Sequence, residues 1–95
     1  MTDELAPLRR RIDACDEQIV QLINERLKVA LEVGELKTRE GLPIRIPERE
    51  DEIIAKILKL NKGPCPSDVL KKVYRILIDT AVGLEESLDS SRPKK

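Results

Sequence analysis

Histidine, tryptophan and phenylalanine are absent from the 95-residue sequence, and Tyr74 is its only aromatic residue. Without histidine, Ser–His and Cys–His nucleophile pairs are excluded, and the most frequent protein ligand of metals is missing. A single aromatic side chain cannot form the stacking surface on which single-stranded nucleic acid is bound. The core must therefore be aliphatic, and we expect no metal site, no cofactor and no nucleic-acid partner.

An excess of charge and long apolar segments are also lacking. The 18 basic and 18 acidic residues give no net charge, so no overall field attracts the protein to nucleic acid or to a membrane. No apolar run reaches the length of a membrane span. The first residues, Met1 to Glu4, lack the basic and apolar segments of a signal peptide. We therefore expect a cytoplasmic protein without a membrane partner.

The two cysteines, Cys15 and Cys65, do not have the spacing of metal ligands. Cys15 falls on an apolar helical stripe, which indicates a core position. Cys65 lies in a Pro-Cys-Pro turn and should be accessible to solvent. We expect no disulfide between them, in keeping with a reducing compartment.

A heptad pattern predicts one long first helix. Apolar or small residues alternate at steps of three and four, at Leu5, Leu8, Ile12, Cys15, Ile19, Leu22, Val29, Val33 and Leu36. Asp3 is the expected N-cap, and nothing ends the helix before Gly41 and Pro43. Such a helix is on the order of 55 Å long, which exceeds the width of a compact domain of this size. Two copies paired along this helix would bury its apolar seam, which predicts an intertwined homodimer.

Two shorter helices are expected to follow. Pro47 suits the first position of the second helix, and residues 61–66 form the turn that ends it. Ser67 is the expected N-cap of the third helix. The apolar stripe of the third helix comprises Val69, Val73, Ile76, Leu77, Thr80, Ala81, Leu84 and Leu88. The sequence thus predicts an all-α fold with three helices per subunit. It forms one domain over residues 1–95, with a structured core at about 8–88 and a flexible tail at 90–95.

Two cations occupy positions that suit a buried anion site. Continuing the alternation from Leu22 to Val29 places Arg26 at a core position. Lys37 lies eleven residues further on, which returns to within about 20° of the same helical face. Small apolar residues separate the two cations, and this arrangement suits a small anion with an apolar ring. The alternative is that Arg26 lies at the edge of the seam and pairs with Glu25 or with an acid of the partner.

An acid occupies a similar position on the third helix. Glu85 lies on the same face as Leu77 and Ala81, at steps of four residues. One interpretation is a boundary side chain that reaches solvent. The other is a partly buried carboxyl group that donates or accepts a hydrogen bond in a pocket.

The order and spacing of these residues resemble those of the all-helical chorismate mutases over nearly the whole chain. The segments that carry the resemblance are Leu8-Arg9 leading to Ile12 and Asp16, Glu25-Arg26, Val33-Gly34 followed by Lys37, and Arg49-Glu50. The resemblance implies an intertwined dimer of three-helix subunits with two active sites, each built from both chains. It also implies the conversion of chorismate to prephenate in phenylalanine and tyrosine biosynthesis.

The resemblance assigns a role to each candidate residue. Arg9 of one subunit and Arg26 of the other would clamp the two carboxylates of chorismate. Lys37 would contact a carboxylate and the ether oxygen of the breaking bond, with Glu85 on the other side of that oxygen. Glu50 would accept a hydrogen bond from the ring hydroxyl, and Arg49 would support it.

Three positions depart from the family's most frequent residues. Ile46 stands where many members have aspartate, so its backbone N–H would replace that contact. Ala81 replaces a small hydroxyl residue, and Glu85 replaces a glutamine. Because a carboxylate cannot donate a hydrogen bond, Glu85 would have to carry a proton to assist the ether oxygen.

The expected reaction is an intramolecular [3,3] rearrangement, the chemistry of an isomerase, and it requires no nucleophile, metal or cofactor. Two alternatives remain. An isochorismate-pyruvate lyase of the same fold carries a run like Pro47-Glu48-Arg49, but tends to have an apolar residue in place of Glu50, so Glu50 favours the mutase. The second is a non-catalytic helical dimerisation module. Whether a larger partner enzyme regulates the protein stays open.

Overall fold

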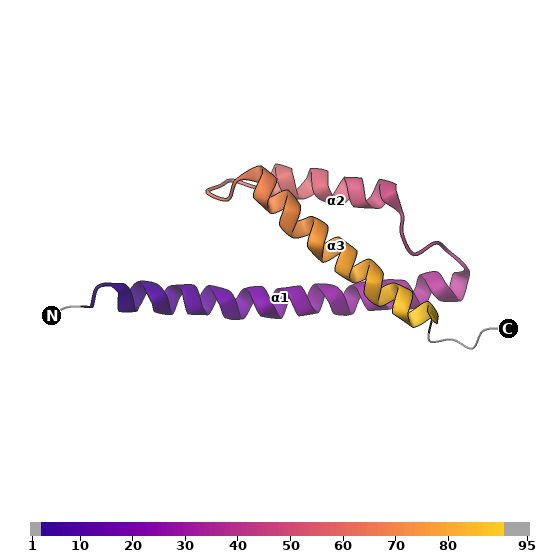
Figure 1. The fold of residues 1–95 in the computed structure, drawn as a ribbon, viewed down its shortest axis with the longest axis horizontal. Coiled ribbons are helices and arrows are strands. Elements are labelled where there is room, and N and C mark those ends of the chain that lie inside the picture. The colour runs from indigo at the N-terminus through magenta and orange to yellow at the C-terminus, as the bar shows by residue number, and fades with distance from the viewer. Residues whose placement is uncertain (1–2, 91–95) are drawn as a thin grey trace.

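The computed structural model describes residues 3–90, which fold into three helices without a strand in that range. Helix α1 spans Leu5–Glu40, α2 spans Pro47–Leu60 and α3 spans Ser67–Ser90. Helix α3 packs against both other helices. Figure 1 shows that it runs diagonally from α2 to the C-terminal part of α1, while the N-terminal part of α1 projects alone. The all-α prediction and the order of one long and two shorter helices are confirmed.

The boundaries of α1 follow from its terminal residues. Glu4, not the expected Asp3, is the N-cap, although the Asp3 carboxylate accepts a hydrogen bond from the Leu5 N–H at 3.1 Å. At the other end, Gly41 adopts a left-handed conformation with φ of 72°, which a residue without Cβ adopts at little cost. The N–H of Leu42 then donates to the carbonyl of Lys37 at 2.8 Å and closes the helix end.

A proline marks the start of each shorter helix: Pro47 is the first residue of α2, and Pro66 directly precedes α3. Pro47 occupies the first turn of α2, as expected from its fixed φ and missing N–H. The expectation that Ser67 caps α3 is wrong by one residue. The carbonyl of Pro66 accepts hydrogen bonds from two following N–H groups, so Ser67 already belongs to the helix. Ser90 is also helical rather than part of a tail, and residues 91–95 of the expected tail lie outside the described range.

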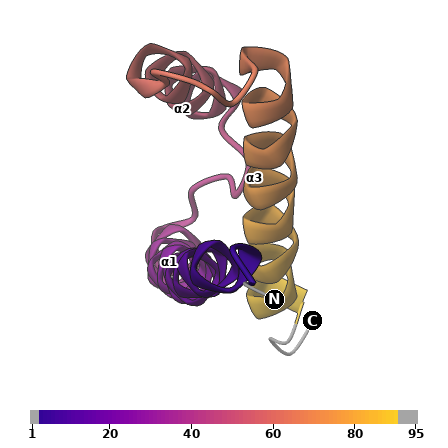
Figure 2. The same cartoon turned by 90° about the vertical axis from the view of Figure 1, so that its left-hand side faces the viewer.

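The buried aliphatic side chains lie where α3 meets the other helices. They are Ile54 and Ile57 of α2 and Ile78, Ala81 and Val82 of α3. Of the expected stripe of α3, Ala81 is buried and Leu77 and Leu88 are half-buried. The expectation is wrong for the single chain at the other five positions, which are exposed: Val69, Val73, Ile76, Thr80 and Leu84. Figure 2, a view along α1, shows α2 and α1 against the same side of α3, one near each end. The buried residues Ile78, Ala81 and Val82 lie on one face of α3, at steps of three and four residues.

Much of the heptad seam of α1 is uncovered in the single chain. Leu8, Ile12, Ile19 and Leu22 are all at least half exposed, and Cys15 is exposed rather than buried. These positions precede the part of α1 that α3 covers (Figure 1). None of the described helices is long and apolar enough to span a membrane.

Candidate active site

A cleft of about 400 Å³ lies between the C-terminal half of α1, the turn before α2, and the facing sides of α2 and α3. A volume of this size suits a small molecule. Its walls are largely aliphatic, with Val29, Val33, Ile53 and Ile78 among them. The cleft brings together seven of the eight site residues expected from the sequence: Arg26, Lys37, Ile46, Arg49, Glu50, Ala81 and Glu85.

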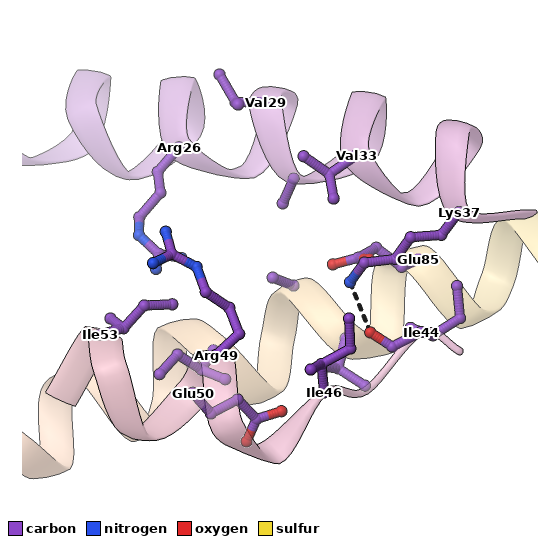
Figure 3. A pocket seen from close by; sticks show the side chains of 14 residues that line it. Arg26, Val29, Val33, Lys37, Ile44, Ile46, Arg49, Glu50, Ile53 and Glu85 are labelled. Carbon is purple, nitrogen blue, oxygen red and sulfur yellow. Dashed lines mark hydrogen bonds and ion pairs between the residues drawn. The ribbon is translucent and has the colours of Figure 1, made fainter. Parts of the chain in front are cut away.

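Lys37 and Glu85 form a buried ion pair at one end of the cleft. The Lys37 ammonium group lies 3.2 Å from a carboxylate oxygen of Glu85, and the two side chains are only 16% and 6% exposed. The same ammonium donates a hydrogen bond to the carbonyl of Ile44 at 2.7 Å, drawn in Figure 3. The burial of Glu85 excludes the interpretation in which it reaches solvent. It lines the cleft together with Lys37.

Gly34 allows α1 and α3 to approach closely at this ion pair. A Cβ atom at Gly34 would lie 2.6 Å from Cγ and 3.0 Å from Cβ of Glu85, which is far below van der Waals contact. Gly34 is also the only buried residue of α1. The sequence interpretation did not assign it a role. Its function is to admit the Glu85 side chain between the helices and so keep it within reach of Lys37.

Replacing Gly34 by alanine should therefore displace Glu85 from Lys37, although alanine is favoured over glycine in a helix by about 1 kcal/mol. The matched control is Gly83→Ala in α3, where a new Cβ meets nothing within 4 Å. We expect Gly83→Ala to raise the melting temperature and Gly34→Ala to lower it. Thermal unfolding of both variants tests this. Equal gains in stability would contradict the close approach.

Arg26 lies toward the other end of the cleft, with Lys37 at the opposite end (Figure 3). Its guanidinium carbon lies 5.6 Å from the centre of the Tyr74 ring, a distance that permits a cation–π interaction. Within residues 3–90 no ion pair joins Arg26 to Glu25, whose carboxylate accepts a hydrogen bond from Gln21. Pairing of Arg26 with an acid of a partner chain stays a prediction. Arg49 also extends toward Arg26 in Figure 3, and it pairs with Glu52 on the exposed side of α2. The sequence interpretation missed the contact between Arg26 and Tyr74.

Glu50 is buried and held by two arginines. Nη1 of Arg45 lies 2.8 and 3.1 Å from its two oxygens, and Nη1 of Arg75 lies 2.8 Å from Oε1. Nη2 of Arg45 also donates to Asp79 at 3.0 Å. This hydrogen bond to Asp79 raises the pKa of Arg45 above its ordinary value. The sequence interpretation found Glu50 but not Arg45, Arg75 or Asp79.

Arg9 is the expected site residue that the cleft of its own chain does not contain. It is exposed, on the projecting part of α1. It precedes Arg26 by seventeen residues, which corresponds to roughly 25 Å along a helix. One small molecule cannot contact both residues within a single chain.

Within residues 3–90, no group of three potential metal-ligating side chains is close enough to hold a metal ion. The fold and the cleft define a small three-helix protein that can hold a compact anionic molecule between cations at the two ends of an aliphatic pocket. The model of the family described as chorismate mutase type II matches residues 8–86, and the chain belongs to that family.

Relatives from bacteria and archaea agree with this assignment. The chain is 46% identical over 90 residues to the bifunctional chorismate mutase/prephenate dehydratase of Aquifex aeolicus, covering 90% of this chain and 25% of that protein. It is 38% identical over 87 residues to the chorismate mutase of Methanocaldococcus jannaschii, covering 90% and 88% of the two chains. The chain thus spans a quarter of the bifunctional relative and most of the archaeal one.

A solved structure is also similar. Form II of the chorismate mutase from Thermus thermophilus has a TM-score of 0.85 and 32% identity, covering 88% of this chain and 96% of that chain. The predicted family and the all-α fold of three helices are confirmed, and the intertwined homodimer stays a prediction. The roles of individual site residues stay predictions.

Proposed function

We propose that the protein is a chorismate mutase, which converts chorismate to prephenate in the biosynthesis of phenylalanine and tyrosine. The observation that carries this proposal is the cleft with Arg26 at one end and the buried Lys37–Glu85 pair at the other, in a chain of the type II family. Conversion of chorismate by the purified protein, with identification of the product, tests it.

The arrangement suits a unimolecular rearrangement. The reaction needs a compact, chair-like conformer and stabilisation of the negative charge that develops on the ether oxygen. Arg26 and Arg9 of the partner subunit would hold the two carboxylates, since guanidinium groups bind carboxylates with two hydrogen bonds. Lys37 would lie beside the ether oxygen, with its ammonium group already oriented by the Ile44 carbonyl. Such a prepositioned cation stabilises developing charge without reorganisation.

We propose that two chains form an intertwined dimer along α1. The uncovered seam supplies the surface, since Leu8, Ile12, Ile19 and Leu22 are 50%, 59%, 52% and 62% exposed in the single chain. A second copy would bury these side chains and at the same time bring its Arg9 to the cleft. Cys15, which carries a free thiol, would then become a core residue. Free cysteines suit a reducing compartment, and we propose that the protein is cytoplasmic.

The remaining residues would complete the site around the substrate. Glu50 would accept from the ring hydroxyl, with Arg49 beside it. The backbone N–H of Ile46, at the N-terminus of α2, would contact a polar group of the ligand. Ala81 is 6% exposed and would pack against the ring. An acceptor at Glu50 favours chorismate over isochorismate, whose hydroxyl lies on a different ring carbon. Incubation with isochorismate should therefore release no pyruvate.

Glu85 gives the proposed reaction a pH dependence. In its ionised form it accepts from Lys37 and cannot donate to the ether oxygen, whereas its protonated form can. We therefore expect kcat to fall as the pH rises, because only the protonated carboxyl group can donate. Glu85→Gln should remove this decrease, because an amide donates at every pH.

The measurement is kcat against pH for the wild type and Glu85→Gln, at constant ionic strength. Glu86→Gln, which changes the exposed neighbour on α3, is the matched control and should retain the wild-type profile. Superimposable profiles of the wild type and Glu85→Gln would show that Glu85 does not act on the reacting oxygen.

A further inference from the structure

The carboxylate of Glu50 lies at the centre of a charged network that joins three separate segments. Arg45 comes from the turn before α2, Glu50 from the first turns of α2, and Arg75 and Asp79 from α3. Arg45 bridges Glu50 and Asp79 through two different nitrogens, and Arg75 lies 3.9 Å from Asp79. Glu50 is 8% exposed, so its orientation is fixed by these partners rather than by water.

The hydrogen bonds from the arginines occupy most, but not all, of the acceptor positions of the Glu50 carboxylate. A carboxylate offers about four acceptor positions on its two oxygens. Oε1 accepts from both arginines at 2.8 Å, whereas Oε2 accepts only the longer contact of 3.1 Å from Arg45. Oε2 therefore keeps one acceptor position, and Glu50 lines the cleft. A hydroxyl donor on a bound ligand can use this position.

We propose that Arg45 and Arg75 are positioning residues that set the affinity of the site for the ring hydroxyl of the substrate. Both donate to Oε1 of Glu50, and Arg45 alone donates to Oε2, which leaves one acceptor position of Oε2 for the ligand. The proposal rests on the proposed function, because it presumes a hydroxylated ring in the cleft. Neither arginine needs to contact the ligand.

A lysine can keep the hydrogen bond of Arg75 but not those of Arg45. Arg75 reaches Glu50 through one nitrogen, so the single ammonium group of Arg75→Lys can keep this bond. Arg45 binds Glu50 and Asp79 through the two arms of a planar guanidinium, a geometry that an ammonium group does not reproduce. Arg75→Lys should therefore retain hydroxyl recognition, whereas Arg45→Lys should lose it.

A purely structural network predicts a different outcome. If the arginines only fasten the turn and α2 to α3, their loss lowers stability and weakens every ligand alike. If they act through Glu50, their loss weakens only ligands that carry the hydroxyl. Two bicyclic transition-state mimics, one with the ring hydroxyl and one without it, separate the two cases.

The experiment measures Kd of both mimics for the wild type, Arg75→Gln, Arg75→Lys and Arg45→Lys. Lys71→Gln is the matched control, since Lys71 is an exposed cation one turn earlier on α3. We expect the wild type, Arg75→Lys and Lys71→Gln to prefer the hydroxylated mimic. In Arg75→Gln and Arg45→Lys, the ratio of the Kd of the mimic without the hydroxyl to that of the hydroxylated mimic should fall by about tenfold. This is the effect of one charge-assisted hydrogen bond. Their melting temperatures show whether they are folded during the measurement.

An unchanged preference in a folded Arg75→Gln variant would overturn the proposal, as would an equal loss of affinity for both mimics. If Arg75→Gln does not fold, the comparison of Arg75→Lys with Arg45→Lys decides, and equal preferences in these two would overturn the proposal. A wild-type protein that binds neither mimic and leaves chorismate unchanged would instead reject the proposed function. The two failures are therefore distinguishable.

Discussion

Replacing Lys37 by alanine should lower kcat by a factor on the order of 10² or more, the usual effect of removing a donor to developing negative charge. Its ammonium group is held by Ile44 and Glu85 at the end of the cleft, so it is in place before the charge develops. KM should change less than kcat, because the interaction strengthens in the transition state. Lys28→Ala, at an exposed position of α1, should retain wild-type kinetics.

The loss of Lys37 also affects folding, and this effect must be separated from catalysis. Lys37→Ala leaves the carboxylate of Glu85, only 6% exposed, without its cation, and breaking such a buried pair costs about 3 kcal/mol. Lys37→Ala combined with Glu85→Gln removes the uncompensated charge. We expect the double variant to regain melting temperature but not kcat. A change confined to KM in either variant would mean that Lys37 only binds the substrate.

Mixing two inactive variants should restore activity if Arg9 acts in the partner's site. Arg9→Ala and Arg26→Ala should each abolish activity alone, since each removes one carboxylate clamp from every site. A mixed dimer has one site that lacks both arginines and one intact site. Random exchange makes about half of the dimers mixed, so about a quarter of the wild-type activity should return in a two-fold symmetric dimer.

Arg26→Ala mixed with Lys37→Ala is the matched control for this experiment. Both residues line the cleft of the same chain, so every site of the mixed dimer carries one defect and no activity should return. Subunit exchange is verified by mass spectrometry of isotopically labelled chains. If exchange is complete and Arg9→Ala with Arg26→Ala stays inactive, Arg9 does not act across the dimer.

Much of the fold could be predicted because its signals are local. The prolines and glycines that bound the helices act through their own backbone, so Pro47 and Gly41 marked helix ends directly. The heptad spacing gave the length of α1, and helical periodicity placed Arg26 and Lys37 on one face. The prediction that Ser67 is the N-cap was wrong because the carbonyl of Pro66 accepts the first hydrogen bonds of the helix. The preference for serine as an N-cap did not decide the boundary.

The missed residues depend on contacts between distant parts of the chain. Arg45 and Asp79 are 34 residues apart, and Glu50 and Arg75 are 25 apart. In a chain with 38% charged residues, neither spacing distinguishes these residues from many exposed ones. The role of Gly34 likewise depends on how closely α3 crosses α1, which no local pattern encodes.

The most direct test of the central claim is the consumption of chorismate by the purified protein, followed by its absorbance and with the product identified by NMR. Arg26→Ala protein prepared in the same way controls for the uncatalysed rearrangement and for contaminating enzyme. The proposed function predicts prephenate as the product, formed far faster by the wild type than by Arg26→Ala. Wild-type protein that is folded but leaves chorismate unchanged would contradict it.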